Sequence, residues 1–334
     1  MKKVLLCVIL LLTLVNCNYK NDIETTAIQA SSYIVIEQST NKILEGYNYD
    51  TQRSVASISK IMTAIVVIER VNIDSYTIVP EEVMKVYGSS MYLKVNEKVT
   101  IKDLLYGLLL RSGNDAAITL SLATCNSIDE FVILMNQKAQ ELNMKNTLFS
   151  NPHGLDEMDN GNISTAYDMA LLYSYCLQNP TFVDITSCKS YGNYVNKNKL
   201  LRNYQYCTGG KTGYTKKAKR TLVTSASKDN INLIVVTLNC GGDFSAHQNI
   251  YEHYFNNYQS IKILNKGINI FDNNELYCLK DYFFITNQTN LSLLYQIDYY
   301  KKQIKITLLD NNQRVIDYTE VNFSLINNNK KNAD

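Results

Sequence analysis

The stretch that decides the fold runs from residue 209 to residue 238, with GGKTGYT at 209–215, RTLVTSA at 220–226 and INLIVVTL at 231–238. The last two runs are rich in β-branched residues, and the short segments between the three runs are basic or polar. Short turns join antiparallel neighbours. The stretch therefore predicts three consecutive antiparallel strands.

Two earlier runs extend this sheet, and apolar helical patterns fill the space between. Residues 33–37 (YIVIE) and 42–47 (KILEGY) predict two strands joined by Ser39-Thr40-Asn41. A sheet built from both ends of one region, with helices between, predicts an α+β domain with a five-stranded antiparallel sheet and helices largely on one side. The expected helices follow Ser57 and span Ile101–Leu110 (N-cap Thr100), Asn114 to about Thr124, Ile128–Leu142, Thr165–Leu177 and Ser245–Tyr258.

The last part of the chain has a different character. From about residue 262 to 325, short alternating runs such as QIKITLL (303–309) are separated by Asn-rich turns. We expect a main domain over residues 30–258 followed by a small all-β domain over 262–325. Residues 326–334 are polar and are expected to be a disordered tail.

The first residues are typical of a secretory signal peptide. Met1-Lys2-Lys3 is basic, and residues 4–15 form an apolar run too short to span a membrane comfortably. We expect a leader over residues 1–26. Its processing has two interpretations: a lipoprotein box, LVNC at 14–17, that would lipidate Cys17, or conventional cleavage near Ala27 or Ala30. The second is favoured, because Asn16 is not the small residue that a lipoprotein box requires.

Composition excludes some classes of function. The chain is 46% hydrophobic and 19% charged, and its formal net charge of +2 includes Lys2 and Lys3 of the expected leader. A nearly neutral mature protein argues against a nucleic-acid partner bound by bulk charge. Eight cysteines without a C-x-x-C pair and only three histidines argue against a structural zinc site and suit free, buried thiols better than disulfides.

Three short motifs carry the chemistry. A serine hydroxyl needs a neighbouring base to become a good nucleophile, and Lys60 lies one helical turn after Ser57. Ser112-Gly113-Asn114 and Lys211-Thr212-Gly213 follow in order. The Ser-x-x-Lys spacing occurs three times, at Ser39/Lys42, Ser57/Lys60 and Ser225/Lys228. Of these three serines, only Ser57 precedes a long apolar helical pattern.

Four strings in one order resemble the D-alanyl-D-alanine carboxypeptidase family, the low-molecular-mass penicillin-binding proteins that trim peptidoglycan. They are SISKIMTA at 57–64, SGNDAA at 112–117, NPHGLD at 151–156 and KTGYT at 211–215. The resemblance covers roughly residues 30–258 and implies a β-lactamase/transpeptidase-like domain. The region after 262 is similar to the C-terminal β domain of the family in position and strand content only.

The resemblance also implies a role for each motif residue. Ser57 would attack the bond between two D-alanines, with Lys60 as general base and with Lys211 as a cation that lowers the pKa of Lys60. Ser112 and Asn114 would relay a proton to the leaving amine, and the backbone N–H groups of Ser57 and Tyr214 would form the oxyanion hole. The residues expected to bind substrate are Lys211 and Thr212, which would hold its terminal carboxylate, with Gly213 and Tyr214.

No metal or organic cofactor is implied. The expected ligands are a peptidoglycan stem peptide ending in D-Ala-D-Ala and β-lactam antibiotics, outside the cytoplasmic membrane. The last residues lack the amphipathic helix that many family members use, so membrane contact is expected only through an N-terminal anchor. We interpret His153 as part of a structural turn, since Lys60 already fills the role of base.

Two alternatives remain at this point. A class A-like β-lactamase shares the fold and two motifs, and Glu157 lies in roughly the stretch where such enzymes carry a glutamate that activates water. A non-catalytic scaffold with the same fold is the second alternative, although the motif residues are all intact. The sequence favours a serine-type D-Ala-D-Ala carboxypeptidase that acts in cell-wall biogenesis and cell shape.

Overall fold

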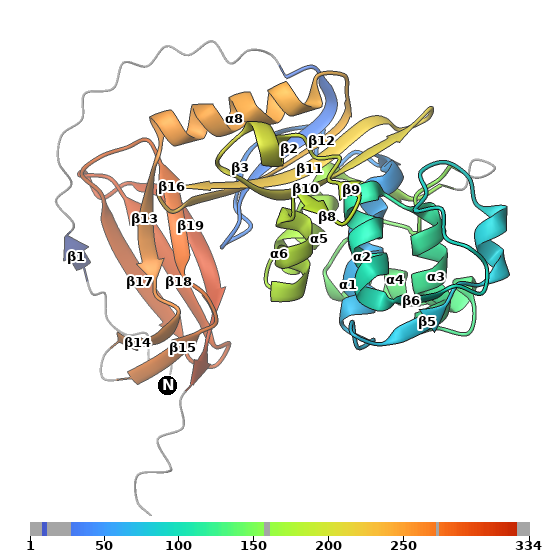
Figure 1. Cartoon of the computed structure of the whole chain (residues 1–334). Helices are drawn as coiled ribbons and strands as arrows, with labels where there is room; N and C mark the ends of the chain where they lie inside the picture. The colour runs from blue at the N-terminus through green and yellow to red at the C-terminus, as the bar shows by residue number, and fades with distance from the viewer. Residues whose placement is uncertain (1–8, 12–27, 157–160, 272–273, 326–334) are drawn as a thin grey trace, which may run out of the picture.

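The computed structural model describes residues 9–11, 28–156, 161–271 and 274–325 (Figure 1). Of the expected leader it therefore describes only Ile9–Leu11, which form the short strand β1 and pair antiparallel with β17 (Ser292–Asp298). The remaining leader residues, the tail from 326 and Glu157 lie outside the described residues. The signal peptide and the lipidation of Cys17 stay predictions.

A five-stranded antiparallel sheet forms the centre of the main domain, as the sequence predicts. Its strand order is β10-β11-β12-β2-β3, so the N-terminal pair of strands adds to the edge of the C-terminal three. Strand β10 lies at one edge of the sheet, so one of its sides has no neighbouring strand among the described residues. The strands are β2 (Ala30–Glu37), β3 (Ile43–Tyr47), β10 (Cys207–Thr215), β11 (Lys219–Lys228) and β12 (Ile231–Cys240).

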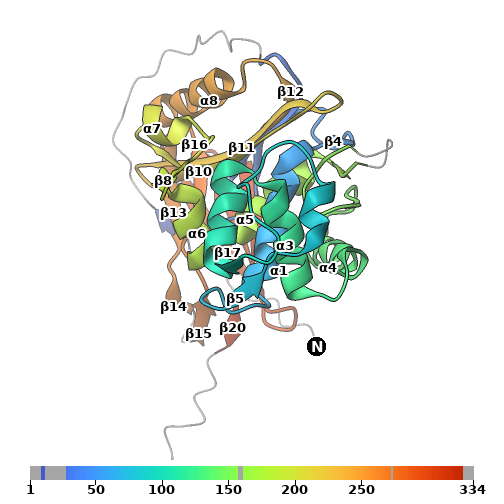
Figure 2. The ribbon, with the colours of Figure 1, turned by 45° about the vertical axis from the view of Figure 1, so that its right-hand side comes forward.

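Helices pack against one face of this sheet around a single large apolar core (Figures 1 and 2). Helix α1 lies at the centre of this core, and its residues 60–67 are all buried. A helix that is apolar on every side has no solvent face and must be surrounded by other elements. The helices of this layer are α1 (Lys60–Ile68), α2 (Ile101–Tyr106), α3 (Asn114–Thr124), α4 (Ile128–Glu141), α5 (Ala166–Cys176) and α6 (Pro180–Ser187).

Helix α8 (Asp243–Asn257) covers the opposite face of the sheet (Figure 1). Its buried Tyr251 and Phe255 pack on Val35 and Val235, and Leu200 of the short helix α7 (Leu200–Asn203) joins the same cluster. Because side chains alternate along β2 and β12, these strands contribute residues to two separate cores, one on each face of the sheet.

The predicted elements agree with the observed ones to within a few residues. Thr100 caps α2 by accepting a hydrogen bond from the Asp103 N–H, as its position suggested. Helix α2 continues as a short π-helical segment (Gly107–Arg111) that brings the chain to Ser112. The sequence analysis missed short elements with weak periodicity: α6, α7 and the hairpins β5–β6 (Tyr76–Ile78, Lys98–Thr100) and β8–β9 (Ser190–Tyr191, Tyr194–Val195).

The C-terminal part is an all-β unit with its own apolar core, and its first strand starts at Gln259, slightly before the predicted boundary. It contains β13 (Gln259–Leu264), β14 (Gly267–Phe271), β15 (Asn274–Cys278), β16 (Tyr282–Thr286), β17, β18 (Gln303–Leu309), β19 (Val315–Asn322) and β20 (Ser324–Leu325).

The β2–β3 turn connects the two parts. The Phe283 N–H donates to Ser39 Oγ over 3.1 Å, and Lys42 forms an ion pair with Asp317. Ser39 Oγ in turn donates to the buried carboxylate of Glu37. One of the other Ser-x-x-Lys pairs, Ser39/Lys42, therefore has a structural role at the junction of the two units.

The described residues also bear on membrane crossing, metal binding and disulfide bonds. No single helix there is long and apolar enough to cross a membrane, and α3 with α4 reaches that length and composition only as a pair bent by 89°. No group of three His, Cys, Asp or Glu side chains is placed to hold a metal ion within those residues. The six described cysteines are free thiols, and Cys176, Cys240 and Cys278 are buried.

Helix α4 allows a matched test of the core. Phe131 is fully buried against α1, whereas Ile133 on the same helix is 55% exposed. We expect Phe131→Ala to lower the free energy of unfolding by about 3–4 kcal/mol, through lost burial and the cavity left behind. Ile133→Ala should change it by less than about 1 kcal/mol. Urea denaturation of both variants measures this, and similar losses would contradict the proposed packing.

Candidate active site

Ser57 lies in a tight 3₁₀ turn, η1 (Ala56–Ser59), that runs directly into α1. The preceding Ala56 has φ of +51°, a left-handed conformation that costs a residue with a Cβ on the order of 1–3 kcal/mol. Close packing holds this turn: a Cβ on Gly154 would lie 2.1 Å from Ala56 O, so only glycine fits there. The turn thus presents Ser57 at the N-terminal end of the buried helix.

The Lys60 side-chain nitrogen contacts Ser57 directly. Lys60 Nζ lies 3.2 Å from Ser57 Oγ and 2.7 Å from Asn114 Oδ1, and it also donates to the backbone oxygen of His153. Lys60 is fully buried. Its Nζ has these three oxygens as hydrogen-bond partners, and the predicted serine–lysine pair is formed.

Burial is the main cause that holds the pKa of Lys60 well below the ordinary value of lysine, and the positive charge of Lys197 lowers it further. The charge of Asp115 acts in the opposite direction. A low pKa favours the neutral amine, which is the form that accepts a proton. The sequence analysis expected Lys211 to be the cation that depresses this pKa. The structure instead gives this effect to Lys197, a residue that the sequence analysis did not single out.

Ser112 and Asn114 come from the turn between the π-helical segment and α3. Ser112 has φ of +66°, and this left-handed residue ends the first helix and places Asn114 at the start of the next. Asn114 is fixed at both ends of its amide, since Nδ2 donates to Tyr87 O and Oδ1 accepts from Lys60. The Ser-Gly-Asn motif therefore lies in the inter-helix turn that the sequence predicts.

Asp115 anchors the loop that faces this turn. Its buried carboxylate accepts hydrogen bonds from Ser90 Oγ and from the backbone N–H groups of Met91 and Leu93, at 2.6–3.1 Å. The same loop brings Ser89 O within 2.7 Å of the Asn114 N–H. Asp115 was not among the predicted site residues, although it directly follows Asn114.

Lys211 projects from the free edge strand β10 toward Ser112. Its Nζ donates to Ser112 Oγ over 3.0 Å and to Thr212 O over 2.7 Å. Burial, and then the charges of Lys60 and Lys197, hold the pKa of Lys211 well below the ordinary value. Ser112 is thus bonded to Lys211, whereas Asn114 is bonded to Lys60, so the two polar residues of the second motif connect the two buried lysines to the site.

Gly213 allows β10 to approach Ser57 closely. A Cβ at this position would lie 2.4 Å from Thr221 Oγ1 and 3.0 Å from the Ser57 backbone nitrogen. No other residue fits this gap without displacing the turn that carries Ser57. The glycine of the third motif therefore sets the distance between strand and nucleophile.

Lys197 joins the motifs from a loop between β9 and α7. Its Nζ donates to Ser89 Oγ over 2.7 Å, and burial and the charge of Arg111 lower its pKa. Its backbone N–H donates to Leu110 O. No motif marks this lysine in the sequence, because its position depends on a loop without regular periodicity.

These residues surround one cavity of about 790 Å³. Five of the predicted residues line it, and Lys60, Asn114 and Lys211 lie behind them, buried. The structure thus brings all eight predicted site residues together. The five that line the cavity are Ser57, Ser112, Thr212, Gly213 and Tyr214.

His153 contributes its backbone to the site. Its oxygen accepts from Lys60, and its Nδ1 accepts from the Leu155 N–H at 3.2 Å. Burial, and then the charge of Lys60, lower the pKa of His153 to about 3, so the ring is neutral at physiological pH. This agrees with the interpretation of His153 as part of a turn rather than as the base.

The fold and the serine–lysine site define the class of penicillin-binding and transpeptidase-like proteins. Among solved structures, the chain is similar to penicillin binding protein 5 from Haemophilus influenzae, with a TM-score of 0.79 and 25% identity over 91% of this chain and 99% of that one. Penicillin binding protein 6B from Escherichia coli gives a TM-score of 0.73 and 26% identity over 91% and 98%. Both matches include most of the C-terminal β unit, since they cover nine tenths of the chain.

The family model for D-alanyl-D-alanine carboxypeptidase, peptidase family S11, matches residues 19–242. The chain is 35% identical to the D-alanyl-D-alanine carboxypeptidase DacF of Bacillus subtilis over 62% of this chain and 57% of that protein. It is 33% identical to DacD of Escherichia coli over 72% and 66%. The chain belongs to the D-alanyl-D-alanine carboxypeptidase family, and its matches span 57–66% of the length of these two relatives.

Lys197 gives a test of the electrostatics. We expect Lys197→Met to raise the pKa of Lys60, because a positive charge beside a lysine favours its neutral form. The acylation of Ser57 by a β-lactam, measured by stopped flow against pH, should then rise at higher pH than in the wild type. Lys216→Met, in the exposed β10–β11 turn, is the charge-matched control, and an unmoved profile in Lys197→Met would contradict the assignment.

Burial of Lys60 also predicts a pH dependence of stability. Its pKa is lower in the folded than in the unfolded chain, so the unfolded chain binds more protons and the free energy of unfolding rises with pH. The slope is at most about 1.4 kcal/mol per pH unit, between the lowered pKa and about 10.5. Lys60→Met should flatten this slope in urea denaturation, whereas Lys216→Met should leave it unchanged; parallel curves for all three proteins would refute the prediction.

Proposed function

We propose that this protein is a serine-type D-Ala-D-Ala carboxypeptidase that removes the terminal D-alanine from peptidoglycan stem peptides. The observation that carries this proposal is the fully buried Lys60, whose pKa is low and whose Nζ lies 3.2 Å from Ser57 Oγ at the wall of the cavity. A neutral amine at hydrogen-bond distance from a serine hydroxyl is what nucleophilic catalysis without histidine requires.

Acylation begins with transfer of the Ser57 hydroxyl proton to the neutral Lys60 amine. Ser57 Oγ then attacks the carbonyl carbon between the two D-alanines, and the carbonyl oxygen becomes negative. The backbone N–H of Ser57, beside Gly213, and that of Tyr214 receive this oxygen; one such donor is worth roughly 3 kcal/mol in related acyl transfer. This part of the mechanism needs no charged side chain at the oxyanion.

Collapse of the intermediate breaks the C–N bond, and the leaving D-alanine takes a proton from the site. Asn114 holds the Lys60 amine, and Ser112 lies between the cavity and Lys211, so the proton has a short route from Lys60 or through Ser112. Water then attacks the ester carbonyl while Lys60 accepts a proton from that water. The C–O bond to Ser57 breaks, Lys60 returns the proton to Ser57 Oγ, and the shortened peptide leaves with a new carboxyl group. Bonds and protons balance without a cofactor.

The expected setting follows from the substrate. Peptidoglycan lies outside the cytoplasmic membrane, so the enzyme acts there, in the building and remodelling of the wall that sets cell shape. The expected leader over residues 1–26 fits this location.

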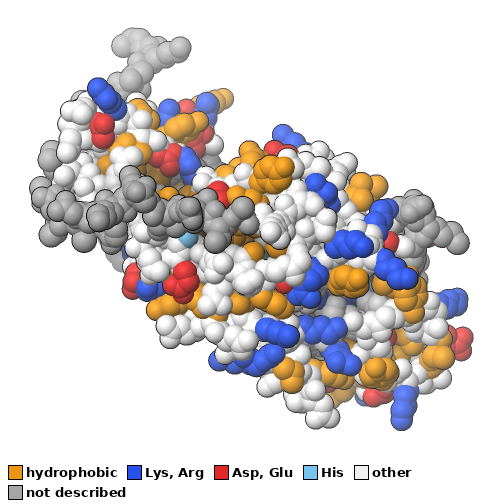
Figure 3. Space-filling view, turned by 90° about the horizontal axis from the view of Figure 1, so that it is seen from above, with side chains coloured by type: hydrophobic (Ala, Val, Ile, Leu, Met, Phe, Trp, Pro, Cys, Tyr) orange, Lys and Arg blue, Asp and Glu red, His pale blue; other side chains and the backbone are white. Residues whose placement is uncertain are grey.

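Side chains of Lys and Arg gather on the face of the domain seen from the side of α8, with few acidic side chains among them (Figure 3). Such a face suits a peptide that ends in a carboxylate.

The test is intact-protein mass spectrometry after mixing the mature chain with benzylpenicillin. We expect a long-lived adduct of one drug molecule on the wild type, none on Ser57→Ala, and an unchanged adduct on Ser75→Ala, which removes a hydroxyl from the turn before β5. Release of D-alanine from an N-acetylated peptide ending in D-Ala-D-Ala should be lost in the same variant that loses the adduct.

Other outcomes favour other functions. A fleeting adduct with rapid hydrolysis of the drug favours a β-lactamase, the reading in which Glu157 activates water. No adduct and no D-alanine release from folded wild-type protein would overturn the enzymatic proposal and favour a non-catalytic scaffold.

A further inference from the structure

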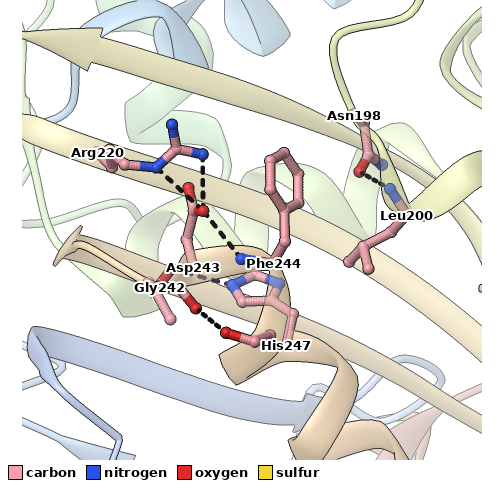
Figure 4. A network of polar contacts seen from close by, with 9 residues as sticks. Asn198, Leu200, Arg220, Gly242, Asp243, Phe244 and His247 are labelled. Carbon is pink, nitrogen blue, oxygen red and sulfur yellow. Dashed lines mark hydrogen bonds and ion pairs between the residues drawn. The ribbon is translucent and has the colours of Figure 1, made fainter. Parts of the chain in front are cut away.

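The active-site cavity has walls of different character. On the side of the sheet, Arg220 Nε and Nη2 both donate to Asp243 Oδ1, at 3.1 and 2.7 Å, and form a fixed ion pair (Figure 4). On the side of the helices, the cavity is lined by Ser89. This serine belongs to the rim loop, residues 86–97, which joins the 3₁₀ turn η2 (Glu81–Lys85) to β6. The proposed mechanism uses no aromatic side chain of the rim loop.

Two tyrosines of the rim loop leave their side chains largely in water. Tyr87 is 64% exposed and Tyr92 is 77% exposed, and they lie on either side of Ser89 in the chain. Tyr214 of β10, which lines the same cavity, is 63% exposed. Exposed large apolar side chains that gather beside a cavity, with polar groups around them, are typical of a binding surface.

The backbone of the rim loop is held firmly, although its tyrosine rings are exposed. The Asn114 N–H donates to Ser89 O over 2.7 Å, and Asn114 Nδ2 donates to Tyr87 O. Arg111 Nε donates to Ser90 O over 3.3 Å, in addition to the hydrogen bonds that the Asp115 carboxylate accepts from this loop. The two rings therefore start from fixed backbone positions, so a ligand that binds them loses little free energy in ordering the loop.

Tyr92 has a backbone conformation that is unfavourable for a large residue. Its φ of +65° is left-handed, a region that glycine and asparagine adopt more easily. Its neighbours Met91 and Leu93 pack against the apolar core, and a Cβ on Gly107 would lie 1.9 Å from Met91 Sδ. The Tyr92 ring belongs to none of the apolar cores of the described residues. Packing does not explain a tyrosine here, and strain of this kind occurs most often at functional sites.

The chemistry of the proposed substrate indicates what these rings would bind. A stem peptide is attached to a glycan strand, so the sugars lie outside the cavity when the D-Ala-D-Ala end reaches Ser57. Sugar rings carry C–H groups on their faces and hydroxyl groups at their edges. A tyrosine offers the matching surface, an apolar ring face with a polar hydroxyl at its end. The alanines at the cleaved end of the peptide are too small to cover two such rings.

We propose that the rings of Tyr87 and Tyr92 form a platform that binds the sugar rings of the glycan strand from which the stem peptide extends. This inference rests on the proposed carboxypeptidase function and adds a second part of the substrate to it. The platform holds the polymer beside the cavity while Ser57 reacts with the peptide end. It contributes to binding before and during the reaction equally, so it lowers KM and leaves kcat unchanged.

The experiment compares two substrates that differ only in the glycan. One is a short peptidoglycan fragment that carries one stem pentapeptide ending in D-Ala-D-Ala, and the other is the same pentapeptide with an N-acetyl group in place of the sugars. Release of D-alanine, followed by chromatography, gives kcat and KM for each. We expect Tyr92→Asn to lower kcat/KM for the glycan-bearing substrate by about 5- to 20-fold, through KM, and that for the peptide by less than about 2-fold.

Further variants separate binding from folding. Tyr92→Asn should melt at or above the temperature of the wild type, because asparagine tolerates the left-handed conformation. Tyr92→Phe keeps the ring and should keep most of the preference for the glycan-bearing substrate. The double variant Tyr87→Ala/Tyr92→Asn should remove that preference. Tyr300→Ala, in the turn between β17 and β18, removes a ring that is 97% exposed and should match the wild type.

A binding measurement tests the platform without catalysis. The Ser57→Ala protein is mixed with a peptide-free glycan fragment, and saturation-transfer NMR reports which sugar protons contact it. We expect signals from the protons on the sugar faces and their loss when Tyr92→Asn is added to Ser57→Ala. The absence of sugar signals with Ser57→Ala alone would refute the platform.

The outcomes distinguish this inference from the proposed function. If the wild type cleaves neither substrate, the proposed function fails, and the NMR measurement decides on the platform by itself. If the wild type cleaves both substrates equally well, the function stands and the platform is refuted. A loss of the same size on both substrates in Tyr92→Asn would also refute it, because the ring would then act on the peptide or on the fold of the site.

Discussion

The rest of the structure depends on the buried amine of Lys60. A lysine shielded from water on every side is unfavourable as a cation, so its pKa falls and its neutral form becomes available as a base. That condition requires α1 to lie at the centre of the domain, with helices and sheet packed around it. The same burial that makes the lysine reactive makes the helix a core element. Fold and chemistry therefore depend on one constraint, the exclusion of water from one end of α1.

Burying lysines together works against the stability of the folded state, and the structure shows what offsets it. Lys60 and Lys211 each find oxygen acceptors, from Asn114, His153, Ser112 and Thr212, and each has a lowered pKa. Burial of apolar side chains in the large cores on both faces of the sheet supplies the favourable free energy of folding. Strain is confined to single residues, such as the left-handed Ala56 and Ser112, that aim the functional groups.

Much of this architecture follows from sequence, because its signals are local. The strands of the sheet, the capped helices and the three motifs can each be predicted from a hydrophobic period, a capping residue or a residue spacing in the sequence. The eight predicted residues do meet at one cavity. Lys197, Asp115 and the Arg220–Asp243 pair escaped prediction because each acts across a distance in sequence. In the sequence, Arg220 is only the first residue of a predicted strand; the β11 register and the start of α8 bring Asp243 to it.

The edge strand β10 explains why one site can hold both catalysis and recognition. Successive side chains of a strand point to opposite faces, so Lys211 and Gly213 face the helices and the nucleophile, while Thr212 and Tyr214 face α8. A central strand has both of its edges paired and leaves no room for a peptide, whereas β10 has one edge free. In the proposed function, the order Lys-Thr-Gly-Tyr thus alternates between groups that serve the reaction and groups that meet the substrate. A one-residue shift of register would exchange these two sets, which makes the pairing of β10 with β11 as decisive for function as the motif itself.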